Sequence, residues 1–430
     1  MLCPYVQFYS SHIGGEILSN IIFHIDVNNA FLSWSAVDML NNGYHVDLRN
    51  VASAVAGDPT LRHGVILAKS PLAKKMGVKT GESIAEARKK CKELKLISPN
   101  HELYNAESHK LKKLLEKYSD KIEQFSIDEF FIEYIPTLGS YMTVAKAIQK
   151  EVMTTLGITV NIGISTNKLL AKMASDFEKP NKIHTLFPNE IESKMWPLPV
   201  GELIFCGNSA QKKLNLIGIK TIGDLAKSSK DTIYRLLKNP GIQLHEYANG
   251  IDNSKINYMP TTPKSISQST TLSCDLTNIT QIEKVILTLC NMTSSKLRAQ
   301  NLSTKTISIC LRTNTFKDYS TSKTLCFATD TTNEIYKVCK ELLSNVYSNE
   351  KIRLVGVSLS NLESSSSLQL SFLDKPNEKD SKIDKIMDEI CNKYPCNKQI
   401  LTRASLINNV EYKNPHKYAN TTDTDASNNS

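Results

Sequence analysis

Apolar and polar residues follow two different spacings along the first half of the chain. Short apolar runs typical of buried strands occupy residues 21–26, 65–68 and 158–164, and a strand, a turn and a second strand are expected at 122–126, 127–129 and 130–134. Between them, apolar residues recur at helical spacing over residues 82–93, 105–120, 140–156 and 167–177. This interleaving predicts one sheet covered by helices, an α/β layer architecture, over residues 21–190.

The pattern changes twice further along the chain. Residues 190–260 read as short helices interrupted by glycines, and a proline-containing linker follows at 258–265. Strands return at 306–311 and 354–359, and the helices expected beside them cover residues 280–300 and 332–346. From about residue 411 the chain is rich in Asn, Thr, Ser and Asp, which predicts disorder.

Composition and charge narrow the class of protein. With 430 residues, 40% hydrophobic and 22% charged, the chain can form several packed domains. Its apolar runs fall short of the roughly 20 residues that span a bilayer, and residues 1–20 lack a secretory pattern, so we expect a cytoplasmic protein with no membrane partner. A net charge of +9 favours a polyanionic partner.

Three carboxylates form the most informative group. Asp26 ends one predicted strand, and Asp128 and Glu129 lie in the turn between two others. If these strands are neighbours, the carboxylates converge and repel one another unless hard cations such as Mg²⁺ or Mn²⁺ neutralise them. Two such ions are suited to in-line phosphoryl transfer. Spacing alone leaves open that all three are solvated turn residues.

Three motifs in order carry a resemblance to a known family. They occupy residues 24–31, residues 126–129, and residues 163–175 running on to 179–181. Together they resemble the motifs of the Y-family, or translesion, DNA polymerases. Within that family the chain is most similar to the UmuC and DNA polymerase IV-like proteins of Gram-positive bacteria, from about residue 21 to about residue 408.

The resemblance implies a right-hand polymerase fold, α/β and multidomain. Its expected parts are an N-terminal extension (1–20), a palm (21–35 and 98–189), small fingers (36–97), a helix-hairpin-helix thumb (190–259), an α+β little finger (260–373) and a C-terminal tail (374–430). The implied activity is template-directed, low-fidelity addition of dNTPs to a primer 3′ end, in DNA damage tolerance under the SOS response.

The resemblance also implies roles for the residues of the first two motifs. Asp26 and Asp128 would bridge two Mg²⁺ ions, for which Mn²⁺ can substitute, and Glu129 would complete the ion at the primer end. The backbone carbonyl of Val27 would be a further ligand. Phe31 would be a steric gate against the ribose 2′-hydroxyl, and the alternative is a core aromatic at a helix start.

Triphosphate binding is expected from cations and a hydroxyl. Lys168 begins a helix whose N-terminus also favours anions. Where the family places a Tyr and an Arg, this chain has Pro71 and Lys74, and Ser70 would supply the missing donor. The lysine ammonium group is a point charge, whereas the planar arginine guanidinium can bind a phosphate through two parallel hydrogen bonds. A solvated lysine-rich helix face is the alternative.

DNA contacts are expected from the thumb and the little finger. Residues 204–225 resemble a helix-hairpin-helix that approaches a phosphate through glycine, although Phe205 stands where its first glycine is expected. Residues 262–373 carry 12 Lys and Arg against 8 Asp and Glu, which favours backbone binding. The candidate contacts are Gly207, Lys212, Lys213, Lys264, Arg298, Lys305, Arg312 and Lys323.

The chain also carries a short segment that resembles the sliding-clamp peptide of bacterial polymerases. Its residues are Gln369, Leu370, Phe372 and Leu373, and a final strand of the domain is the alternative. The expected partners are therefore primer–template DNA, dNTP, the β sliding clamp and a RecA filament. Two other functions stay open, a UmuC-like subunit that needs accessory proteins and a DNA-binding protein without catalysis.

Overall fold

A computed structural model describes residues 12–13, 16–17, 21–58, 64–259, 262–364 and 378–393. The chain divides into two compact units, of which the first contains Met1–Gly57 and Val65–Pro260 and the second contains Thr261–Lys417. Near the N-terminus, strands β1 (His12–Ile13) and β2 (Glu16–Ile17) pair antiparallel. The disorder predicted from about residue 411 concerns residues outside the described part.

A five-stranded sheet forms the centre of the first unit. Its order is β10 (Ile183–Thr185), β9 (Val160–Ser165), β3 (Ile22–Val27), β8 (Glu129–Glu133) and β7 (Ile122–Gln124). Only β9 and β10 pair in parallel. Phe23, Ile25 and Val27 point from β3 into a core shared with helices α4 (His101–Leu115) and α5 (Tyr141–Leu156), because alternate strand residues face opposite sides.

Helix α6 (Lys168–Asp176) lies on the opposite face of the same sheet. Gly163 on β9 makes this close approach possible. A Cβ atom there would stand 1.9 Å from the carbonyl oxygen of Ala171 and 2.5 Å from the amide nitrogen of Ser175, so only glycine fits. The residues of β3 on this face, Ile22, His24 and Asp26, are therefore buried beneath or beside α6.

A smaller layer follows helix α1 (Ala30–Asn41). Its sheet has the order β5 (Ile66–Lys69), β4 (Ser53–Ala56) and β6 (Lys95–Ile97), and it carries the short helices α2 (Pro71–Lys75) and α3 (Ile84–Lys90). The sequence pattern had not indicated β4, because its two alanines lack the β-branched character of the other strands.

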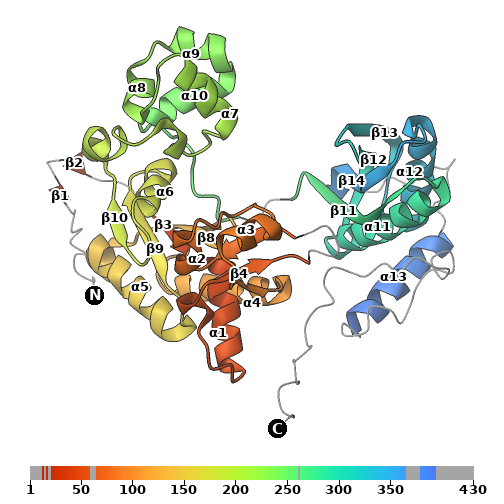
Figure 1. Ribbon diagram of the computed structural model, residues 1–430, viewed down its shortest axis with the longest axis horizontal. Helices are drawn as coiled ribbons and strands as arrows, with labels where there is room; N and C mark the ends of the chain where they lie inside the picture. Colours follow the sequence, from red (N-terminus) through yellow and green to blue (C-terminus); the bar gives the residue numbers. More distant parts are fainter. Residues whose placement is uncertain are drawn as a thin grey trace, which may run out of the picture. The chain divides into compact units, whose positions relative to one another are not determined.

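Four helices complete the first unit, shown in green in Figure 1: α7 (Asn208–Leu216), α8 (Ile222–Lys227), α9 (Lys230–Leu237) and α10 (Asn239–Ala248). Their apolar side chains share one core with Leu169, Leu170 and Met173 of α6. Helix α6 thus packs on the sheet with one side and on this helical cluster with the other.

The second unit is a four-stranded antiparallel sheet with helices on one face. The sheet order is β11 (Ser265–Leu276), β14 (Ile352–Ser364), β12 (Leu302–Thr313) and β13 (Asp318–Thr329). Helices α11 (Ile279–Ala299) and α12 (Thr332–Val346) bury the apolar side chains of β12 and β14. Among the described residues, no helix is long and apolar enough to cross a bilayer.

Candidate active site

A pocket of about 410 Å³ opens in the first unit where the central sheet meets the smaller layer. Four elements contribute the residues that the sequence had singled out, and the loop at Lys179 adds a lysine to the lining. These are Asp26 and Val27 (β3), Phe31 (α1), Ser70, Pro71 and Lys74 (around the start of α2), and Asp128 and Glu129 (start of β8).

Strand register explains why the three carboxylates converge. In the antiparallel pair of β3 and β8, Asp26 is the direct partner of Glu129. The amide of Val27 donates to the carbonyl of Asp128 at 3.1 Å, and the Asp128 carboxylate accepts from the Ser126 hydroxyl at 2.6 Å. Like charges directly opposite each other across two strands are destabilising, so this arrangement requires cations.

Two lysines supply positive charge to this group. Lys179 donates to the Asp26 carboxylate, and Lys172 of α6 donates to Glu129. Burial raises the pKa of the Asp26 carboxyl to about 6, although Lys179 acts against the rise. Burial lowers the pKa of Lys179, but the carboxylates of Asp26 and Asp176 outweigh it and the net shift is upward. Above about pH 6 the pair is therefore ionised on both sides.

Neither Lys172 nor Lys179 is among the residues for which the sequence motifs imply a role. Both belong to the third motif, so the signal was present in the sequence. Their partners lie 43 and 153 positions away, and only the packing of α6 against the sheet brings them together.

The donor set fits hard divalent cations. Carboxylate and carbonyl oxygens are the ligands that Mg²⁺ prefers, and the pocket gathers them from Asp26, Val27, Asp128 and Glu129. Among the described residues, no group of three or more Asp, Glu, His or Cys side chains has a geometry that could hold a metal ion. Two of the carboxylates instead form ion pairs, Glu129 with Lys172 and Asp26 with Lys179.

A buried amide network holds the loop that carries Lys179. Asn28 donates to the side-chain oxygen of Asn161 at 3.1 Å and accepts from the amide of Asn181 at 2.9 Å. Asn161 in turn donates to the carbonyl of Glu178 at 2.6 Å. Because both Asn28 and Asn161 are buried, these bonds fix the loop on both sides of Lys179.

Phe31 presents its ring to the pocket in a fixed orientation. The ring stacks on Tyr104 of α4, with 4.6 Å between centroids and an angle of 8° between planes. Trp34 and His101 also contact it, at centroid distances of 6.2 and 6.0 Å. The side chain is half-buried, so it is both packed on one face and exposed to the pocket on the other.

The start of α2 places one cation on the pocket wall and a fully buried hydroxyl beside it. Ser70 is the N-cap, and its hydroxyl accepts from the amides of Ser53 and Ala73, both at 3.1 Å. Pro71 occupies the first helical position, where no N–H is required. The side chain of Lys74 is exposed, and it can reach a ligand in the pocket.

Lys168 does not line this pocket. Both carboxylate oxygens of Glu123 hold its ammonium group, at 2.7 and 2.8 Å, and the ring of Phe131 lies 4.9 Å away. Lys168 lines a second pocket instead, between the sheet and the helical cluster. Lys179 is the lysine of the third motif that reaches the first pocket.

The candidate DNA contacts lie in both units. Gly207 caps the N-terminus of α7, and Lys212 and Lys213 are exposed on that helix. In the second unit Lys264 is exposed. The other surface cations pair with acidic neighbours, Lys305 with Glu363, Arg312 with Asp318, and Lys323 with Glu341.

Arg298 has a structural position that conflicts with its expected role. Its side chain is 7% exposed, and it contacts Asp384 and Asp388 of helix α13 (Glu378–Lys393), at 3.3 and 2.6 Å. Asp384 also accepts from the amide of Thr332 at 2.8 Å and so caps the N-terminus of α12. Arg298 is therefore unavailable to a DNA backbone, because it fastens a helix that the sequence reading had treated as tail.

Replacing Asp384 by alanine should destabilise the second unit. The change leaves a buried guanidinium short of one partner and removes the cap of α12, so we expect a loss of about 3 kcal/mol in the free energy of unfolding. Urea unfolding followed by circular dichroism measures it. Glu341→Ala, which breaks an exposed pair with Lys323, is the control and should change stability little. Equal stability of both variants would show that α13 is not fastened in this way.

The predicted clamp segment, Gln369, Leu370, Phe372 and Leu373, lies outside the described residues, which resume at residue 378 after Ser364. Its two interpretations are therefore not distinguished by the fold.

Comparison with known proteins agrees with these features. Residues 25–176 match the impB/mucB/samB family, and residues 263–372 match the C-terminal domain of the same family. A DNA polymerase IV of Clostridium acetobutylicum is 44% identical over 92% of this chain and 100% of its own length. A DNA polymerase IV of Alkaliphilus oremlandii is 36% identical over 91% of this chain and 100% of its own length.

Solved structures share the fold. A Y-family DNA polymerase chimera of Dbh and Dpo4 superposes with a TM-score of 0.69, at 23% identity, over 80% of this chain and 99% of that one. A ternary complex of Dbh gives a TM-score of 0.57, at 23% identity, over 79% and 98% of the two chains.

Fold and pocket together define a right-hand polymerase, with palm, small fingers, helical thumb and little finger. The chain belongs to the impB/mucB/samB family, that is, to the Y-family DNA polymerases.

Proposed function

We propose that this chain, a translesion DNA polymerase, extends primer 3′ ends by two-metal phosphoryl transfer at the pocket lined by Asp26, Asp128 and Glu129. One observation carries the proposal: strand pairing brings three carboxylates to a pocket that also contains a stacked aromatic ring and three lysines. Primer extension by the purified chain with Mg²⁺ and dNTPs tests it.

Asp26 and Asp128 would hold both ions, with Glu129 and the carbonyl of Val27 as additional ligands. Bound Mg²⁺, or Mn²⁺ in its place, would activate the primer hydroxyl and neutralise charge on the leaving pyrophosphate. Lys172 and Lys179 would release their carboxylates, since a divalent cation bound beside an ammonium group at the same carboxylate repels it. Lys179 lines the pocket and would then be free to pair with the triphosphate, beside Lys74 and Ser70.

Phe31 would select the sugar. Its ring is held by Tyr104 and cannot turn aside, so an additional 2′-hydroxyl would collide with it. The fingers would leave the template exposed, because α2 and α3 contain only 5 and 7 residues. This exposure is the physical basis proposed for damage tolerance and for low fidelity.

Two alternatives are less well supported. Relatives that cover the chain almost completely are named DNA polymerase IV, which favours an enzyme active by itself over a UmuC-like subunit. The presence of Asp26, Asp128 and Glu129 together in one pocket disfavours a DNA-binding protein without catalysis.

Primer–template DNA is proposed to contact Gly207, Lys212 and Lys213 of the thumb, and Lys264, Lys305, Arg312 and Lys323 of the little finger. The RecA filament and the cytoplasmic, SOS-induced setting are part of the same proposal.

We further propose that residues 369–373 bind the β sliding clamp. The double variant Gln369→Ala, Phe372→Ala should lose the stimulation of primer extension by added clamp, while extension without clamp stays unchanged. Equal stimulation of variant and wild type would mean that this segment is not the clamp contact.

A further inference from the structure

Lys69 lines the active-site pocket, although the sequence motifs imply no role for it. It is the last residue of β5, and Lys74 of α2 lines the same wall. The central sheet and the turn before β8 contribute the three carboxylates of the pocket, whereas the smaller layer contributes these two lysines. Carboxylates and ammonium groups therefore enter the pocket from different layers of the fold.

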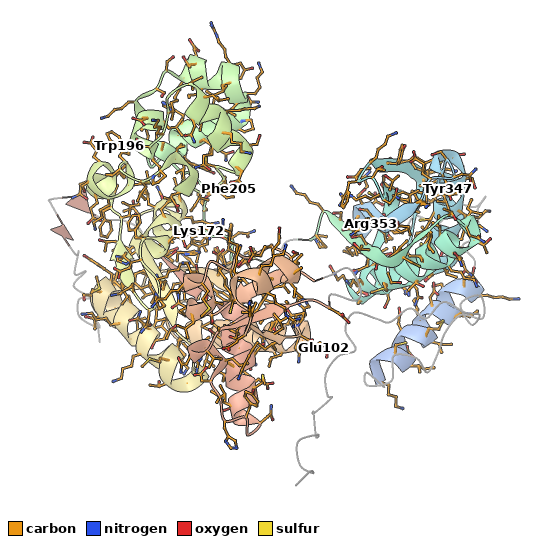
Figure 2. The ribbon with its side chains drawn as sticks, viewed as in Figure 1. Glu102, Lys172, Trp196, Phe205, Tyr347 and Arg353 are labelled. Atoms are coloured by element: carbon orange, nitrogen blue, oxygen red, sulfur yellow. The ribbon has the colours of Figure 1, made fainter. Side chains whose placement is uncertain are left out.

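Two lysines on the palm side of the pocket have acidic partners. Lys179 pairs with Asp26. Lys172 of α6, which is labelled in Figure 2, pairs with Glu129. The protein itself neutralises these two charges, so neither ammonium group attracts an anion as the structure stands.

Lys69 has a neutral partner instead. Its ammonium group donates to the hydroxyl of Thr80 at 2.9 Å, and Thr80 also lines the pocket. The carboxylate of Glu82 acts on Lys69 electrostatically, but it forms its ion pair with Lys90. Within the ranges that the structure describes, neither Lys69 nor Lys74 forms an ion pair. Two positive charges on this wall are therefore not neutralised by the protein.

The pocket disfavours the charged form of Lys69. Burial lowers the pKa of Lys69 and the ammonium group of Lys74 lowers it further, although Glu82 acts in the opposite direction. A lowered lysine pKa means that the surroundings destabilise the ammonium form. An anion bound beside both lysines would relieve their repulsion, and a triphosphate would do so more strongly than a single negative charge.

The other donors on this wall do not meet the need of a triphosphate. Ser70 is fully buried, and its hydroxyl already accepts from the amides of Ser53 and Ala73. A hydroxyl also has only one hydrogen to donate and carries no charge. Lys74 by itself opposes one positive charge to three phosphate groups. Lys69 adds a second charge to the same wall.

We propose that Lys69 binds the triphosphate of the incoming nucleotide together with Lys74, and that the Thr80 hydroxyl positions its ammonium group. The inference rests on the proposed polymerase function and adds a substrate-binding residue to it. Thr80 acts as a positioning residue, because a neutral hydroxyl holds the ammonium group without cancelling its charge. The two lysines would contact phosphate oxygens from the side of the pocket that faces the carboxylates.

Lys69→Met tests the proposal because it removes the charge and keeps the length of the side chain. Single-turnover insertion at increasing dNTP concentration should give a Kd for dNTP about tenfold higher, the scale of one lost charged contact. The maximal rate should stay within about threefold of wild type, since this binding is lost equally in the ground state and the transition state. Lys69→Arg keeps the charge and should keep the Kd within about threefold of wild type.

Inorganic tripolyphosphate separates a phosphate contact from a contact with base or sugar. Isothermal titration calorimetry of the full chain with tripolyphosphate, in the absence of metal, should show about the same tenfold loss in Lys69→Met. Lys75→Met is the matched control for both measurements. Lys75 also lies on α2 and is exposed, but it does not line the pocket, so this variant should match the wild type.

Thr80→Val tests the positioning role. Valine keeps the shape of the side chain and removes the hydroxyl, so the Kd for dNTP should rise about threefold. In combination with Lys69→Met it should add nothing, because Thr80 acts only through Lys69. Losses that add in the double variant would show that Thr80 does not act through Lys69.

Three results for Lys69→Met would overturn the inference. They are an unchanged Kd for dNTP, a loss of dNTP affinity that tripolyphosphate does not share, and an equal loss of affinity for primer–template DNA. Extension of primers by the wild-type chain would leave the proposed function intact in each case. A wild-type chain that binds primer–template without extending it would refute the proposed function, and tripolyphosphate binding would still test Lys69.

Discussion

Asp128→Asn should lower the single-turnover rate of dNTP addition by about a thousandfold or more. Asparagine keeps the size of the side chain and can still accept from the Ser126 hydroxyl, but it removes one negative charge from the pocket. A divalent ion that bridges two carboxylates loses much of its stabilisation when one becomes neutral. Rapid-quench primer extension measures the rate, and anisotropy checks that primer–template binding is kept.

Glu133→Gln is the matched control for this variant. Glu133 lies on the same strand, β8, and its replacement by glutamine also removes one negative charge. Glu133 pairs with Lys121 at 3.0 Å and does not line the pocket. It should extend primers at close to the wild-type rate. An Asp128→Asn protein that kept a tenth of the wild-type rate would mean that Asp128 is not a metal ligand.

Phe31→Ala should admit ribonucleotides. Removal of the ring opens the space that a 2′-hydroxyl would enter, so the ratio of kcat/KM for dNTP over rNTP should fall by about 100-fold or more, the scale at which a steric block operates. The effect should be large because the ring has no freedom to retreat, being stacked on Tyr104. Steady-state incorporation of one matched dNTP and its rNTP measures the ratio.

Tyr44→Ala is the comparison, since Tyr44 follows the end of α1 and lies outside the pocket that Phe31 lines. Its discrimination should match the wild type. If Phe31→Ala kept the wild-type ratio but lost stability, Phe31 would be a core aromatic and the alternative interpretation would hold.

The palm was predictable because its strands are short, β-branched and buried on both faces. The runs at 21–26 and 158–164 correspond to β3 and β9, and the helix expected at 140–156 is α5. Strand β13 was not indicated, because its residues alternate between half-buried and exposed and few of them are apolar. Helix α13 was missed for a related reason, since its charged residues read as a solvated tail.

The convergence of Asp26, Asp128 and Glu129 could be expected from their places at strand ends. The acidic partners of the lysine and arginine side chains could not be predicted. Lys168 was assigned to the triphosphate from its place at a helix start, and the structure gives it Glu123, 45 positions earlier. Arg298 pairs with Asp384, 86 positions later, across a helix contact. Such pairs depend on tertiary packing, which no local pattern encodes.

Single-nucleotide insertion by the purified chain tests the central claim most directly. The chain, Mg²⁺ and dNTPs are mixed with primers annealed to an undamaged template and to one with an abasic site, without other proteins. The proposed function predicts extension on both templates. Binding of primer–template without extension on either one would contradict it and favour a protein that needs accessory subunits or lacks catalysis.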